Sequence, residues 1–137
     1  MKIYFCGSIR AGRQDAELYG RLIDLLKQYG SVLTEHVGFK ELEKSEKTLT
    51  DKFIHDRDID WLKECNVVVA EVTQPSLGVG YEIGRAVAMD KKILCLFRPS
   101  PDKRLSAMIS GADDGSNFVV KNYQEEEAQQ IFKDFFS

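Results

Sequence analysis

The residue best placed to do chemistry is an acidic one, Glu82, inside a glycine-rich segment. The segment, Gln74–Ala86, follows Asn66–Val72, a run with the apolar character of a central parallel strand. It leads into a helical pattern over 78–90. A strand, a Pro/Ser/Gly loop and a helix start, in this order, are where open α/β sheets bind ligands. We therefore expect Glu82 to lie at a ligand crevice.

The expected place of Glu82 in the first helical turn bears on its chemistry. A carboxylate near a helix N-terminus is stabilised in its ionised form, by roughly 0.3–1 kcal/mol when exposed. This favours a nucleophile or a charge stabiliser over a general acid. With Ile83 and Val87 on the core face, Glu82 can point toward the crevice. An ordinary acidic residue of a first turn is the alternative. The helix also carries glycines that would let a ligand approach closely: Gly78, Gly80 and Gly84.

A second candidate is the small loop Gly7–Gly12 after the first strand. It lacks the Lys-Ser/Thr pair of a P-loop. Its backbone N–H groups and the guanidinium of Arg10 could still hold one phosphate. A tight turn with a solvated arginine explains the same residues equally well.

Asp58 lies on a helix predicted over 51–64. If the apolar side chains of that helix, among them Ile54, Trp61 and Leu62, face the core, Asp58 can turn toward the crevice. Otherwise it is a solvated acid on a helix surface.

Tyr4 stands in the middle of an apolar strand, where a phenol needs a polar partner. It is either a satisfied core tyrosine or a residue whose hydroxyl reaches the crevice. His36, at the end of the second strand, could contact a ligand or be an ordinary strand-end histidine. His36 and His55 are not at metal-ligand spacing and no third ligand suggests itself, so no metal site is expected.

Strand and helix patterns alternate along the chain. Strands are expected at 2–6, 31–34 (running on to 37), 66–72, 92–97 and 117–121, and helices at 15–29, 51–64, 78–90, 105–109 and 124–136. This predicts an α/β fold, a doubly wound, Rossmann-like, five-stranded parallel sheet of order 2-1-3-4-5, in a single domain over 1–137. The switch point between strands 1 and 3 then brings the loops after Cys6 and Val72 to one crevice.

The amino-acid composition argues against some classes of function. The 137 residues are 43% hydrophobic and 30% charged, and the net charge of -3 argues against binding to a nucleic-acid backbone. No signal peptide and no membrane span is recognised. The three cysteines, without a CxxC pair, are expected to be buried free thiols, which suits a reducing compartment and a cytoplasmic protein.

Four blocks of the sequence closely resemble the 2′-deoxynucleoside 5′-phosphate N-hydrolases. They are YFCGSIR at 4–10, LTEHV at 33–37, VVAEVTQPSLGVGYE at 68–82 and ILCLFRP at 93–99. The resemblance extends over nearly the whole chain. More distantly, the chain is similar to nucleoside 2-deoxyribosyltransferases, which share the Gly-x-Glu-(Leu/Ile)-Gly core around Glu82.

This resemblance implies hydrolysis of the N-glycosidic bond of a 2′-deoxynucleoside 5′-monophosphate, giving a free base and 2-deoxyribose 5-phosphate. It implies that Glu82 is the nucleophile of a retaining mechanism, that Asp58 assists departure of the base, and that Tyr4 orients Glu82. No metal or other cofactor is implied. The implied substrate contacts, with Gly78 added from the loop pattern above, are Gly7, Ser8, Ile9, Arg10, His36, Ser76, Gly78 and Ser106.

Two features of the resemblance separate neighbouring functions. Ser76 stands six residues before Glu82, where the transferases commonly carry an acidic residue that would repel phosphate, so a monophosphate hydrolase is favoured over a transferase. A nucleotide-binding module without turnover is the third alternative. The resemblance implies a homodimer in which Ser106 reaches the site of the other copy. The protein is expected in the cytoplasm, or also in the nucleus. The base preference stays open.

Overall fold

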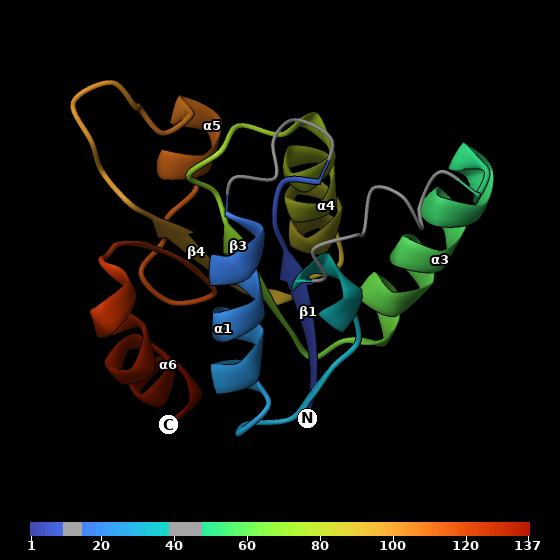
Figure 1. The fold of residues 1–137 in the computed structure, drawn as a ribbon, viewed down its shortest axis with the longest axis horizontal. Helices are drawn as coiled ribbons and strands as arrows, with labels where there is room; N and C mark the ends of the chain where they lie inside the picture. Colours follow the sequence, from blue (N-terminus) through green and yellow to red (C-terminus); the bar gives the residue numbers. More distant parts are fainter. Residues whose placement is uncertain (10–14, 39–47) are drawn as a thin grey trace.

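The computed structural model describes residues 1–9, 15–38 and 48–137. Five parallel strands form one sheet in the order β2-β1-β3-β4-β5, which confirms the predicted topology (Figure 1). The strands are β1 Lys2–Cys6, β2 Ser31–Val32, β3 Val67–Glu71, β4 Lys92–Phe97 and β5 Phe118–Asn122. The helices are α1 Ala16–Leu26, η1 Glu35–Gly38, α3 Asp51–Glu64, α4 Leu77–Ala88, α5 Ala107–Ser110, η2 Glu125–Glu127 and α6 Ala128–Phe136.

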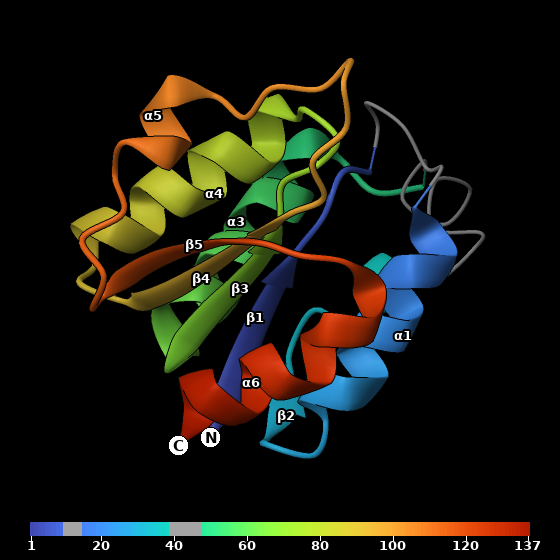
Figure 2. The same ribbon diagram turned by 90° about the vertical axis from the view of Figure 1, so that its left-hand side faces the viewer.

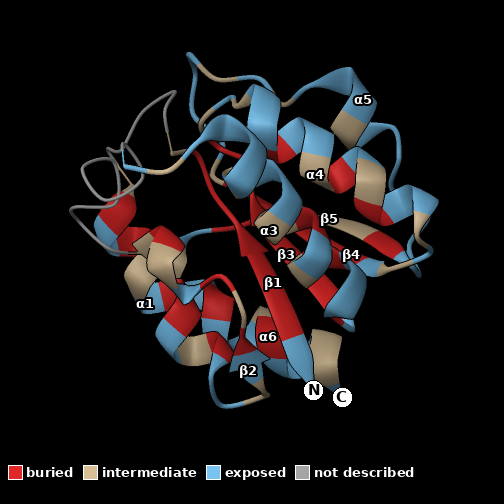
Figure 3. Cartoon of the chain, turned by 90° about the vertical axis from the view of Figure 1, so that its right-hand side faces the viewer, coloured by how far each residue is buried: buried red, intermediate tan, exposed pale blue. Residues whose placement is uncertain are grey.

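The sheet separates two apolar cores, and β1 contributes to both. Because successive side chains of a strand point to opposite faces, Ile3 and Phe5 pack with α1 and α6, whereas Tyr4 and Cys6 pack with α3 and α4. Figure 2 shows α3 and α4 on one side of the sheet and α1 and α6 on the other. Burial along β1 is nearly continuous (Figure 3). The Tyr4 hydroxyl therefore lies on the side of the sheet that α3 and α4 cover.

The second strand is shorter than the sequence predicted. It ends at Val32; residues 33 and 34, which were expected to continue it, form a turn, and the 3₁₀ helix η1 follows from Glu35. Thr34 explains this difference. Its hydroxyl accepts from the backbone N–H of Phe5 at 2.8 Å and donates to the carbonyl of Phe5 at 2.7 Å, which are groups that a longer β2 would have paired.

The helix after β3 also differs from its prediction in two respects. It begins at Leu77, with the Ser76 hydroxyl accepting from the N–H of Val79, so Glu82 is its sixth residue and lies beyond the first turn. Its buried face consists of Val79, Ile83 and Ala86, at the spacing of one helix face, whereas Val87 is half exposed.

Smaller differences occur elsewhere. The final helix starts as the 3₁₀ turn η2, and α5 is only one turn long and begins two residues late. The three cysteines, Cys6, Cys65 and Cys95, are buried and free, as predicted. Within the described ranges, no helix is both long enough and apolar enough to cross a membrane.

Candidate active site

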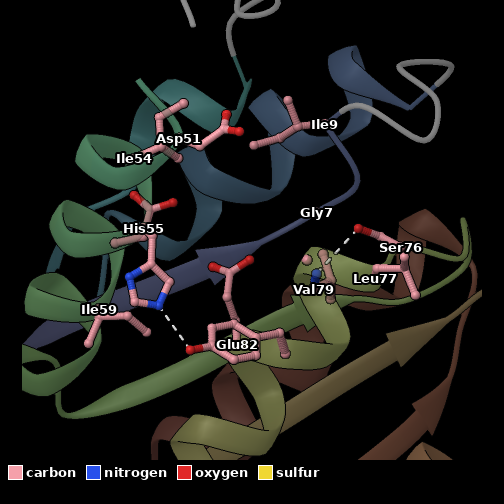
Figure 4. Close-up of a pocket in the computed structure, with 13 residues that line it drawn as sticks. Gly7, Ile9, Asp51, Ile54, His55, Ile59, Ser76, Leu77, Val79 and Glu82 are labelled. Carbon is pink, nitrogen blue, oxygen red and sulfur yellow. Dashed lines mark hydrogen bonds between the residues drawn. The ribbon is translucent and has the colours of Figure 1, made fainter. Parts of the chain in front are cut away.

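A pocket of about 620 Å³ opens between α3 and α4, above the carboxyl end of β1. Its size is that of an ordinary small-molecule site. Figure 4 shows Glu82 near the middle of it, with Ser76 to one side and Asp51 and Ile54 across from them. Its lining comes from the loop after β1, one face of α3 and the start of α4: Gly7, Ile9, Asp51, Ile54, His55, Asp58, Ile59, Ser76, Leu77, Gly78, Val79, Tyr81 and Glu82.

Glu82 stands on the wall of this pocket, and Tyr4 lies behind it. The Tyr4 ring is buried, with 1% of its surface exposed, and its hydroxyl donates a short hydrogen bond to Oε2 of Glu82. Burial, together with the nearby charge of Glu82, raises the pKa of Tyr4 far above its ordinary value, so the hydroxyl remains a donor. Tyr4 is therefore a core tyrosine whose hydroxyl is satisfied by Glu82; Glu82 lines the pocket, whereas Tyr4 lies behind it.

Glu82 is less acidic than its expected place in the helix had suggested. Burial raises the pKa of Glu82 from 4.5 to about 7; the Tyr4 hydrogen bond opposes the increase and the charge of Asp58 adds to it. The prediction that the helix N-terminus keeps Glu82 ionised was wrong. The stabilising field of a helix end fades within the first turn, and Glu82 lies past it. Near neutral pH the carboxyl is thus only partly ionised.

Asp58 lines the same pocket but has a cation beside it. The guanidinium of Arg57 donates from Nε to Oδ1 of Asp58 at 3.0 Å, and both side chains are about one-fifth exposed. A close guanidinium favours the ionised form of a carboxyl group. The buried apolar residues of α3 are Ile59 and Leu62, whereas Ile54, which was expected in the core, lines the pocket. The site therefore holds two carboxyl groups in contrasting environments.

Comparison with known proteins shows the family of this chain. The profile of the nucleoside 2-deoxyribosyltransferase family matches residues 3–131. The chain belongs to this family. It is 63% identical over 139 residues to the 5-hydroxymethyl-dUMP N-hydrolase of Tetraodon nigroviridis, covering 100% of this chain and 98% of that one. It is 55% identical over 136 residues to the 5-hydroxymethyl-dUMP N-hydrolase of Homo sapiens, covering 98% and 78%. These relatives confirm the resemblance to 2′-deoxynucleoside 5′-phosphate N-hydrolases.

A solved structure gives the same fold at lower identity. The CMP N-glycosidase of Clostridium botulinum superposes with a TM-score of 0.71 at 21% identity, covering 98% of this chain and 99% of that one. At this identity the likeness concerns the fold.

Only part of the loop after β1 lines the pocket. Gly7 and Ile9 line it, whereas Ser8 is fully buried beside it, with its N–H donating to the Tyr19 hydroxyl at 3.2 Å. A Cβ at Gly7 would lie 2.7 Å from the Tyr19 ring, so this position has no room for a side chain. Arg10 lies outside the described residues.

The start of α4 supplies the other end of the pocket. Ser76 and Gly78 both line it, as the predictions placed them, and the nearest non-neighbouring atom to a Cβ at Gly78 would be 3.8 Å away. Gly80 and Gly84 are exposed and outside the lining, so only Gly78 fits the expectation of close ligand approach.

Two predicted contact residues lie outside the pocket lining. His36 is in η1, with its Nε2 3.4 Å from Nη2 of Arg57 and its ring 5.5 Å from that of Trp61. Ser106 is the exposed N-cap of α5, where its hydroxyl accepts from the N–H of Met108 at 3.2 Å. The positions of His36 and Ser106 neither support nor contradict the substrate contacts that the resemblance implied for them. Within the described ranges, no group of three His, Cys, Asp or Glu side chains could hold a metal ion.

Sequence reasoning missed several residues of the site, among them Asp51, His55 and Tyr81. A signal for two of them was available. Asp51, His55 and Asp58 are spaced by four and three residues, which places them on one face of α3. His55 had been considered only as a metal ligand. Nothing local marks Tyr81, because its partner His55 lies on another helix.

Proposed function

We propose that this chain is an N-glycosidase that hydrolyses 2′-deoxynucleoside 5′-monophosphates to the free base and 2-deoxyribose 5-phosphate. The observation that carries the proposal is a hydrogen bond from the buried Tyr4 to Glu82, whose carboxyl group lines a pocket of nucleotide size together with that of Asp58. The names of the relatives, 5-hydroxymethyl-dUMP N-hydrolases, support the substrate class.

The proposed chemistry is a two-step displacement at C1′. Ionised Glu82 attacks C1′ as the C–N bond to the base breaks, giving a glycosyl ester on the carboxylate and the base with the bond's electron pair, which takes up a proton from water. A water molecule then attacks C1′ and gives up one proton to solvent, the ester bond breaks to restore the Glu82 carboxylate, and the configuration is retained overall. Tyr4 orients Glu82 through the hydrogen bond to Oε2. The 2-deoxy sugar lacks an electron-withdrawing hydroxyl, so the oxocarbenium-like state forms more easily.

The Arg57 contact changes the role that suits Asp58. Protonating a carboxylate weakens the ion pair that it makes with a guanidinium, so the Arg57 contact suits Asp58 less well to proton donation. Its negative charge can instead stabilise the positive charge that develops on the sugar as the base departs. On this proposal kcat of the wild type does not fall at alkaline pH, and Asp58→Asn lowers kcat at every pH. A fall in wild-type kcat at alkaline pH that is absent in Asp58→Asn would assign Asp58 as a general acid.

The phosphate end of the substrate belongs at the start of α4. Ser76, Gly78 and the first backbone N–H groups of a 12-residue helix lie there. Ser8 and Arg10 are proposed to complete this end, with His36 near the base. Equal kcat/KM for nucleosides and their monophosphates would remove the phosphate roles of Ser8, Arg10, Ser76 and Ser106.

One assay separates the three candidate functions. Each deoxynucleoside monophosphate is incubated with the protein, with and without a competing free base, and the products are separated by chromatography. Free base plus 2-deoxyribose 5-phosphate supports the hydrolase, exchanged base supports the transferase, and bound but unchanged nucleotide supports a binding module. Full turnover by Glu82→Gln, with Glu64→Gln as the exposed control, would exclude the proposed mechanism.

The homodimer is part of the same proposal. Leu77 on α4 and Met108 on α5 are 97% and 83% exposed, and exposed apolar side chains of this size are typical of a surface that a second copy covers. The solution mass tests this directly. A fully active monomer would remove Ser106 from the site.

A further inference from the structure

The half of α3 that forms the pocket wall has little apolar anchoring. The helix runs from Asp51 to Glu64, and its buried residues, Ile59 and Leu62, both belong to the second half. Residues 51–58 are exposed or half-buried, and the start of the helix extends away from the sheet (Figure 1). Asp58 stands at the end of this outer half of α3 (residues 51–58), so its position depends on the contacts that hold the outer half in place.

One support is a hydrogen bond from α3 to α4 across the pocket rim. Nε2 of His55 lies 2.9 Å from the hydroxyl of Tyr81, and the rings are 5.6 Å apart (dashed line from His55 in Figure 4). Both residues line the pocket. The two partners sit beside the two carboxyl groups in sequence, since His55 precedes Asp58 by three residues and Tyr81 is adjacent to Glu82.

The neighbours of this hydrogen bond suit one direction. Nη1 of Arg85 donates to the Tyr81 hydroxyl at 2.7 Å, which leaves the hydroxyl proton for His55. Nδ1 of His55 lies 3.0 Å from a carboxylate oxygen of Asp56, so the tautomer with its proton on Nδ1 donates to Asp56 and leaves Nε2 as the acceptor for Tyr81. Every donor in the chain Arg85–Tyr81–His55–Asp56 thus meets an acceptor, which supports one defined geometry.

The opposite flank of the outer half has its own support. Arg57 lies over the Trp61 ring, with its guanidinium carbon 4.9 Å from the ring centroid, and Nη2 approaches His36 of η1 at 3.4 Å. Arg57 also contacts Asp58 directly. Asp58 therefore lies between a contact to η1 on one side and the hydrogen bond to α4 on the other.

We infer that His55 and Tyr81 are positioning residues: their hydrogen bond fixes the outer half of α3 against α4 and so sets where Asp58 stands relative to Glu82. The inference rests on the proposed function, in which both carboxyl groups act on one sugar. Displacing a group by about 1 Å from its working position can lower a rate by as much as 10²-fold. Binding of phosphate at the far end of the pocket would be affected less.

The test compares Tyr81→Phe, His55→Phe and the double variant, with Tyr29→Phe as a matched control remote from the pocket. We expect each single variant to lower kcat on the order of tenfold with a small change in KM. The double variant should be no slower than the slower single variant, because both remove one hydrogen bond. His55→Gln, which keeps an acceptor for the Tyr81 hydroxyl, should recover most of kcat. Losses that multiply in the double variant, or wild-type kcat in Tyr81→Phe, would overturn the inference.

A second measurement does not depend on turnover. Hydrogen exchange at the backbone amides of residues 55–58 should speed up equally in Tyr81→Phe and His55→Phe, and stay unchanged in Tyr29→Phe. Unchanged exchange in the first two variants would refute the positioning role even if no substrate were turned over. Conversely, turnover by the wild type that is lost in Glu82→Gln supports the proposed function whatever these variants do.

Discussion

The chemistry of Glu82 depends on a balance between burial and one hydrogen bond. Because burial raises its pKa to about 7 and the nucleophile must be ionised, kcat/KM should rise with pH and level off above about 7. Tyr4 donates to the ionised form and opposes the increase. Tyr4→Phe should therefore move this limb to higher pH, on the order of one unit.

The pH–rate profile of Tyr4→Phe also separates the titration of Glu82 from the titration of the substrate phosphate. A phosphate monoester loses its second proton near pH 6, at about the same pH in every variant. A limb that stays in place in Tyr4→Phe therefore belongs to the substrate and contradicts the assignment to Glu82. Tyr29→Phe, whose ring stacks on Phe136, serves as the control.

The same carboxyl group should make the fold less stable at alkaline pH. Its pKa is about 7 in the folded protein against 4.5 unfolded, so the folded state holds its proton more tightly. Its contribution is fully present below pH 4.5 and is lost as pH rises through 7, by about 3 kcal/mol in total. Glu82→Gln cannot ionise and should become the more stable protein above pH 7 in urea unfolding. Parallel stability curves for the two proteins from pH 5 to 9 would contradict the raised pKa.

At the scale of elements, the start of α4 combines a cap with a ligand site. Ser76→Asp keeps an N-cap acceptor for the N–H of Val79 while adding a negative charge to the pocket end. We expect stability within about 0.5 kcal/mol of the wild type and a KM for monophosphates raised on the order of tenfold or more. The kcat/KM for unphosphorylated nucleosides should change little. An equal loss on both substrate classes would place the phosphate elsewhere.

At the scale of the whole molecule, a buried polar network joins the carboxyl ends of three strands to α1. Glu71 is fully buried, with its carboxylate accepting from the Tyr123 hydroxyl at 2.5 Å and from Nε of Arg98 at 3.1 Å. Arg98 also bonds Asp15 just before α1. This network supports the β3–α4 connection, because Glu71 also accepts from the N–H of Thr73.

Removing the Arg98 guanidinium should show how far the buried charge of Glu71 destabilises the fold without its counter-ion. Arg98→Met leaves Glu71 without its counter-ion and should destabilise the fold by about 3 kcal/mol in denaturant unfolding. Adding Glu71→Gln in that background should recover at least about 1 kcal/mol. The control Lys2→Met breaks the exposed Lys2–Glu64 pair and should cost less than about 1 kcal/mol. Additive losses in the Arg98/Glu71 double variant would mean that the two residues act separately.

Local rules predicted most of the fold. The parallel sheet followed from alternating strand and helix patterns, and its order, 2-1-3-4-5, is one of the common doubly wound orders. The prediction failed where a single side chain overrode a pattern. Thr34 replaces the strand pairing that would have extended β2, and the Ser76 cap begins α4 at Leu77, which makes Glu82 its sixth residue and places it beyond the first turn.

By itself, the sequence determined which residues could act and roughly where they would meet. Periodicity, glycine-rich loops and the switch point are local or topological, so they led to Glu82, Asp58 and Gly78 at one crevice. Only the tertiary structure decided the state of those residues. The pKa of Glu82, its bond to Tyr4 and the His55–Tyr81 hydrogen bond depend on burial and on partners far apart in the chain. Desolvation and hydrogen bonding act over a few ångströms of space, whatever the separation in sequence.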